Sequence, residues 1–116
     1  MAAGIYNMTF EQGATKVVSI VYKDPEGVPI NLTGCTARMQ IRPSISSDDV
    51  YVDLTTENGK ITINGSAGLI TLFFSAEDTS ALVTKGVYDL ELVFPDEKVH
   101  RVIQGTVTVS KEVTRG

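Results

Sequence analysis

The side chains that most often carry out chemistry in proteins are scarce in this sequence. His100 is the only histidine and Cys35 the only cysteine, and no second metal-binding side chain of either kind exists to join them. A zinc site needs several such ligands, and a catalytic histidine needs a nucleophile and an acid within reach. We therefore interpret His100 as a solvated strand residue and Cys35 as a small buried hydrophobic residue.

Other motifs for catalysis or ligand binding are also missing from the sequence. It contains no Gly-x-Ser-x-Gly turn for a nucleophile and no glycine-rich loop of the type that holds phosphate. Asp48, Asp49 and Asp53 lie close together, but they lack the spacing, the central glycine and the closing glutamate of a calcium loop. The sequence therefore predicts a protein that is not an enzyme and that binds no cofactor and no metal.

Composition narrows the class of partner further. Asp and Glu number 14 against 10 Lys and Arg, which gives a net charge of −4. This mild acidity, the lack of any basic run and the absence of Trp argue against a nucleic-acid partner. The N-terminus does not resemble a signal peptide, and no apolar run approaches the ~20 residues of a membrane helix. We expect a soluble protein made in a cytoplasm, with no membrane partner, folded as one domain over residues 1–116.

The elements that would position any site are short strands. Apolar and polar residues alternate over residues 35–42 and 86–94, which is typical of strands with one buried face. Further strands are predicted at residues 5–10, 14–23, 50–54, 60–63, 69–74 and 99–109. Turn signals such as Asn58-Gly59 recur every ~8–12 residues between them. The pattern predicts an all-β sandwich or barrel.

Two segments depart from the alternating pattern. Ser75 followed three residues later by Asp78 matches a capping box, and it predicts one short helix over about residues 75–83 with Gly86 beyond its end. The polar residues 44–49 follow Pro43 and predict a mobile loop. Asp89 and Glu91 are predicted to pair with Arg38 and Arg42 if their strands are neighbours.

Two predicted strands carry more apolar residues than one buried face requires. In Leu69–Phe74, Leu69 and Phe73 lie opposite the other apolar side chains, and in residues 5–10 apolar side chains occur on both sides. Either both faces of these strands are buried within the domain, or the second face packs on a partner chain. The candidate interface consists of Ile5, Tyr6, Met8, Phe10, Leu69 and Phe73.

The order and spacing of several short signatures resemble one family of bacteriophage proteins. These signatures are residues 10–14, 22–24, 29–34, 36–42, 58–61, 72–77, 86–92 and 105–109. Together they cover nearly the whole chain, and their layout is similar to the N-terminal domain of upper-baseplate and tail-fibre-anchoring proteins of tailed phages. The resemblance implies an immunoglobulin-like antiparallel β-sandwich without catalytic residues.

The family also implies a place in the virion. A tail, baseplate or fibre-anchoring subunit would contact other virion proteins and symmetry copies of itself. A fibre region follows the sandwich in multidomain members, whereas this sequence ends at Gly116, so we expect a free-standing adaptor. Two alternatives remain at this point: a capsid decoration or head-fibre base protein, and a small-ligand-binding module, which would need a convergent polar pocket.

Overall fold

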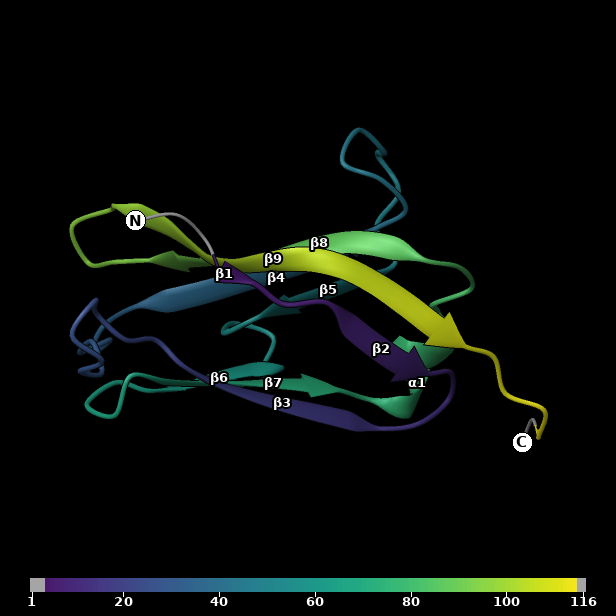
Figure 1. The fold of residues 1–116 in the computed structure, drawn as a ribbon, viewed down its shortest axis with the longest axis horizontal. Coiled ribbons are helices and arrows are strands. Elements are labelled where there is room, and N and C mark those ends of the chain that lie inside the picture. The colour runs from purple at the N-terminus through teal and green to yellow at the C-terminus, as the bar shows by residue number, and fades with distance from the viewer. Residues whose placement is uncertain (1–3, 115–116) are drawn as a thin grey trace.

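A computed structural model describes residues 4–114, and it folds them as two β-sheets packed face to face (Figure 1). The larger sheet contains β1 (Gly4–Ile5), β2 (Met8–Glu11), β4 (Thr36–Arg42), β5 (Val52–Thr55), β8 (Gly86–Val93) and β9 (Val99–Ser110). The smaller sheet contains β3 (Lys16–Val21), β6 (Ile61–Asn64) and β7 (Leu69–Phe74). One helix, α1 (Ala76–Ser80), follows β7. The predicted all-β sandwich with one short helix is confirmed.

The strand order is immunoglobulin-like, except for the place of the N-terminal strands. The larger sheet runs β1-β9-β8-β4-β5 with β2 also on β9, and the smaller sheet runs β3-β7-β6. All pairs are antiparallel except β1 and β2, which run parallel to β9. Immunoglobulin domains pair their first strand with the second strand in an ABED sheet. Here the N-terminal strands join the other sheet, so within residues 4–114 β3 has a neighbour on one side only.

The core lies between the sheets and receives one face of each long strand. Its largest fully buried side chains are Met8, Phe10, Leu32, Met39, Ile41, Leu54, Ile61, Ile70, Leu72, Phe74, Leu82 and Leu90. Phe10 of β2 and Phe74 of β7 meet edge to face, with ring centroids 4.8 Å apart, so they join the two sheets directly. Such aromatic pairs stabilise by more than their buried area alone.

The predicted strand over residues 5–10 is wrong as a continuous element. The chain breaks at Tyr6 and Asn7 between β1 and β2. The Tyr6 carbonyl accepts a hydrogen bond from the buried Tyr88 hydroxyl, and Asn7 Oδ1 accepts one from the Thr106 backbone N–H at 3.0 Å. These bonds hold the chain in a kink over Gly105, where a side chain would overlap the Tyr6 carbonyl. Sequence alternation carries no information about such a kink, because its cause lies in β8 and β9.

The helix is shorter than predicted. It covers Ala76–Ser80 instead of about residues 75–83, with Ala81 as its C-cap. The capping box is confirmed: Ser75 Oγ accepts the Asp78 N–H, and Asp78 Oδ2 accepts the Ser75 N–H, both at 3.0 Å. Leu82 is fully buried against the core, which directs the chain away from the helix axis. Gly86 begins β8, where a Cβ would meet the backbone carbonyl of Arg42.

Candidate interaction surface

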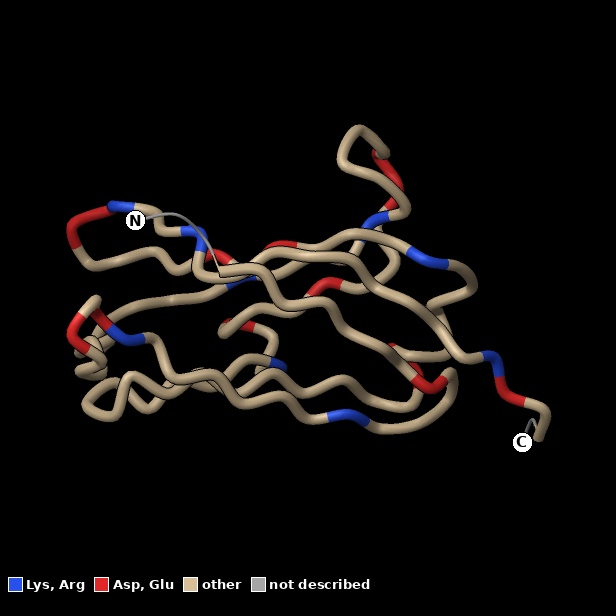
Figure 2. Tube along the Cα trace, in the orientation of Figure 1, with Lys and Arg blue, Asp and Glu red and all other residues tan. Residues whose placement is uncertain are grey.

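The two outer faces of the sandwich differ in charge. The outer face of the larger sheet carries ion pairs, Arg38–Glu91 at 2.9 Å between β4 and β8 and Arg101–Asp89 at 3.4 Å between β9 and β8. The predicted pairing of Arg38 with Glu91 is therefore confirmed, whereas Asp89 pairs with Arg101. These exposed pairs contribute little to stability, but they make this face polar (Figure 2).

A shallow hollow of about 450 Å³ lies on this polar face. Its lining includes Ile5, Gln40, Arg42, Asp89, Arg101 and Gln104. The guanidinium of Arg42 donates to Gln40 Oε1 at 2.7 Å and to the Ser47 carbonyl at 2.7 Å. Arg101 donates to Gln104 Oε1 at 3.1 Å as well as pairing with Asp89. The two arginines of the hollow thus already have partners within the chain, and a ligand that bound them would have to displace those contacts.

The outer face of the smaller sheet carries exposed apolar side chains and is almost without charge. Between Lys16 and Lys23 no charged residue occurs on β3, and none occurs on β7 (Figure 2). Exposure reaches 58% for Val17 and 42% for Phe73, which are cross-strand partners, and 41% for Val21. Leu69, the partner of Val21, is half-buried. We call these four residues the β3/β7 outer face. They form two apolar pairs on either side of Ser19 and Thr71, which are also opposite each other.

The structure separates the six predicted interface residues into three groups. Met8 and Phe10 are buried in the chain's own core, at 2% and 0% exposure, and so present no surface to a partner. Ile5 and Tyr6 are exposed, at 77% and 45%, at the kink beside the polar hollow. Leu69 and Phe73 lie together on the β3/β7 outer face.

Sequence reasoning missed Val17 and Val21 as surface residues. Both faces of the strand predicted over residues 14–23 carry β-branched side chains. The alternating pattern therefore does not distinguish the valines that point outward from Val18, which is buried. Exposed large hydrophobic residues gathered on one face are unusual for a chain that has no partner there. Val17 and Val21 complete a patch of which the sequence indicated only the β7 half.

The only histidine and the only cysteine of the sequence lie outside the β3/β7 outer face. His100 is exposed on β9, as predicted; its Nδ1 is 3.3 Å from the Tyr22 hydroxyl and its ring packs on Phe94. Cys35 is half-buried just before β4, and burial, with the nearby charge of Asp96, raises its pKa. A raised pKa leaves less thiolate and thus a less reactive thiol. Residues 4–114 hold no cluster of three potential metal ligands.

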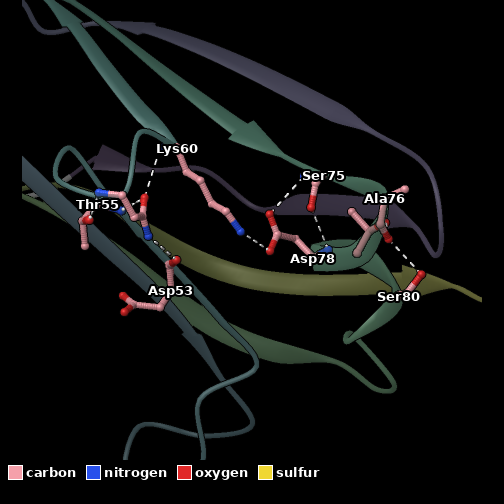
Figure 3. A network of polar contacts seen from close by, with 9 residues as sticks. Asp53, Thr55, Lys60, Ser75, Ala76, Asp78 and Ser80 are labelled. Atoms are coloured by element: carbon pink, nitrogen blue, oxygen red, sulfur yellow. Dashed lines mark hydrogen bonds and ion pairs between the residues drawn. The ribbon is translucent and has the colours of Figure 1, made fainter.

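An ion pair fixes the end of the smaller sheet to the helix. Lys60, whose carbonyl accepts the Phe73 N–H, places its Nζ 2.6 Å from Asp78 Oδ1 (Figure 3). Burial by itself raises the pKa of Asp78, but Lys60 and the Ser75 hydrogen bonds outweigh it, so the pKa lies below its ordinary value. This contact links the residue that precedes β6 to α1, the helix that follows β7.

Replacing Asp78 with alanine is expected to lower the free energy of unfolding by about 1–2 kcal/mol at pH 7, because a helix cap and a partly buried ion pair are lost. The folded pKa is depressed, so this stabilisation is present above the unfolded pKa of about 4 and is lost as pH falls through the folded value. Urea unfolding from pH 7 to pH 2 therefore shows a difference between the two proteins that shrinks on the acid side.

The neighbouring Glu77→Ala variant is the control for this measurement, since Glu77 is an exposed acid in the same helical turn. It should change the unfolding free energy by less than about 0.5 kcal/mol at either pH. A wild-type and Asp78→Ala difference that stays constant down to pH 2 would contradict the depressed pKa.

No helix of the described residues is long and apolar enough to cross a membrane. No protein-family model matches the sequence, and a search among curated proteins also finds no match.

Proposed function

We propose that this chain is a non-catalytic structural subunit of a tailed-bacteriophage virion. It acts as a tail or baseplate adaptor that anchors fibre components through contacts between proteins. Its partners are other virion proteins and further copies of itself, and its location is the tail of the particle.

The observation that carries this proposal is the exposed, nearly uncharged β3/β7 outer face. Val17 and Phe73 expose more than two-fifths of their surface on a sheet whose strands carry one charge at Lys16. Covering such a face removes apolar area from water at about 25 cal/mol per Å², which favours association with another protein surface. We propose a phage virion as the assembly because the sequence signatures resemble those of fibre-anchoring domains. In the polar hollow, the guanidinium groups of Arg42 and Arg101 are already hydrogen-bonded within the chain.

Changing Phe73 to aspartate should reduce incorporation of the chain into particles by about tenfold or more, because a buried charge replaces an apolar contact at the interface. The measurement is quantitative mass spectrometry of particles purified from cells that express the variant. Thr62→Asp is the matched control: Thr62 is exposed on β6 of the same sheet but lies outside the apolar pairs. Thermal unfolding of both variants establishes that they fold.

If Phe73→Asp does not fold, Val17→Asp tests the same face from the more exposed strand. Normal incorporation of folded variants at both positions would place the interface elsewhere on the chain.

Cryo-EM of the assembled particles tests the location. Density for this sandwich on the tail, in contact with a fibre, supports the adaptor role. Density on the capsid shell would instead assign it to decoration or to a head-fibre base. Its absence from the particle would overturn the virion role.

A further inference from the structure

Within the part of the chain that the structure describes, no strand pairs with the edge of β3 that faces away from β7. The Tyr22 N–H donates to the Gly68 carbonyl at 2.9 Å on the β7 side. Backbone groups alternate in direction along a strand, so the N–H and C=O groups of Val17, Ser19 and Val21 point away from β7. Among the described residues, β3 pairs with β7 alone. The same three residues therefore present unpaired backbone groups at the edge and side chains on the outer face.

The other sheet edges are shorter or already closed. At β5 the Asn58 side chain takes up the edge groups: its Oδ1 accepts the Thr55 N–H and its Nδ2 donates to the Asp53 carbonyl, both at 3.1 Å (Figure 3). The β1–β2 edge is interrupted by the kink, and β6 has four residues against six in β3. Open edges of this length are templates for pairing with another strand, and proteins usually block them.

We propose that β3 pairs with β3 of a second copy of this chain, antiparallel, about a two-fold axis through Ser19. In this register Val17 faces Val21 of the second copy, Ser19 faces Ser19, and Val21 faces Val17. All of these residues have backbone groups directed at the edge, so each facing pair exchanges N–H···O=C bonds. A two-fold interface uses the same patch on both copies and so must be self-complementary.

The side chains of β3 meet this requirement on both faces. On the inner face, Val18 faces Ile20 of the second copy, and both are β-branched. On the outer face, the pair Phe73–Val17 of one copy lies in line with the pair Val21–Leu69 of the second copy, where the two β3 strands meet. The two β3/β7 outer faces thereby merge into one apolar surface on a continuous sheet.

The charges on and beside β3 are compatible with pairing to a second copy. In this register Lys16 faces Tyr22 and Lys23 faces Thr15 of the second copy, so neither lysine meets a like charge. The net charge of −4 opposes self-association in general, but no acidic residue lies on β3 or β7. This pairing rests on the proposed assembly role in one respect: both use the β3/β7 outer face. The dimer itself needs no other virion protein.

Analytical ultracentrifugation of the purified chain over a range of concentrations, up to about 1 mM, tests the pairing. The wild type should form a dimer in a concentration-dependent way. Val17→Lys with Val21→Lys places like charges opposite each other twice, and it should raise the dissociation constant by about tenfold or more. Val17→Lys with Val21→Glu is the matched variant, because each lysine then faces a glutamate, and it should dimerise more tightly than the double-lysine variant.

A backbone variant tests the edge itself. Ser19→Pro removes an N–H that points away from β7, a position where an edge strand tolerates proline, and it should abolish the dimer. Ser19→Thr keeps the N–H and should leave the dimer intact. Thermal unfolding of each variant separates loss of pairing from loss of fold.

A wild-type chain that remains monomeric at all concentrations overturns the pairing, and so does a dimer that survives both double-lysine substitution and Ser19→Pro. A dimer weakened equally by the double-lysine and the lysine–glutamate variants overturns the register. None of these results decides the proposed virion role. That role is tested by the particle measurements, which do not depend on a dimer in solution.

Discussion

Phe74→Ala is expected to lower the free energy of unfolding by about 3–5 kcal/mol, as is usual when a fully buried aromatic ring is truncated. Phe74 is fully buried, and its ring packs edge to face on Phe10 of the other sheet. Its removal leaves a cavity between the sheets and ends a direct contact between them. Domains of this size are stable by about 5–15 kcal/mol, so the loss is a large part of the total. Urea unfolding followed by circular dichroism measures it.

The adjacent Phe73→Ala variant is a matched control, because it removes the same ring from the next residue of β7. Phe73 is 42% exposed on the outer face, so its truncation should cost less than about 1 kcal/mol. The same pair of variants should show the reverse order in particle incorporation, where Phe73 is the residue proposed to contact a partner. Equal losses of stability at the two positions would contradict the division between core and surface.

Gly105→Ala is the second change expected to have a large effect, lowering the unfolding free energy by about 2–4 kcal/mol. A Cβ at Gly105 would overlap the Tyr6 carbonyl and lie 2.8 Å from Asn7 Oδ1 and 2.9 Å from the Tyr6 carbonyl carbon. Backbone atoms cannot turn aside as a long side chain can, so the kink between β1 and β2 must move. Moving it separates the Tyr6 carbonyl from the Tyr88 hydroxyl and leaves a buried hydroxyl without its acceptor.

Gly4→Ala is the control on the same seam between the N-terminal strands and β9. Its Cβ would find only ordinary contacts, the nearest at 3.6 Å from Ile103, so stability should change by less than about 0.5 kcal/mol. Amide hydrogen exchange adds a local readout: Gly105→Ala should lose protection first in β2 and the facing part of β9. Unchanged protection there would show that the kink accommodates a methyl group.

The two outer faces of the sandwich differ in the side chains that they expose. The larger sheet exposes a polar face with paired charges. The smaller sheet exposes apolar side chains and, among residues 4–114, an unpaired edge at β3. Association through the smaller sheet would leave the polar face free. The expected interface therefore moves from the mixed set of six residues to the β3/β7 outer face, with Leu69 and Phe73 retained from that set.

Local patterns in the sequence were sufficient for most of the strands. β7 lies at Leu69–Phe74 as predicted, and β4 and β8 differ from their predicted bounds by one residue at one end. Alternation with a period of two residues indicates which side chains share a face of a strand. Turn residues indicate where the strand ends. The Ser75–Asp78 capping box also follows from types and spacing alone, because its contacts lie within one helical turn.

The sequence by itself determined the class of fold, because alternation and turn signals depend on residue types and on neighbours along the chain. Only the tertiary structure decided which of two apolar faces is the core. Met8 and Phe10 are buried, whereas Val17 and Val21 are exposed. Burial depends on which sheet covers a strand, and contacts between distant residues set the order of strands in the sheets. The kink at Tyr6 and the open edge of β3 have the same origin: the N-terminal strands pair with β9, and no local pattern specifies that choice.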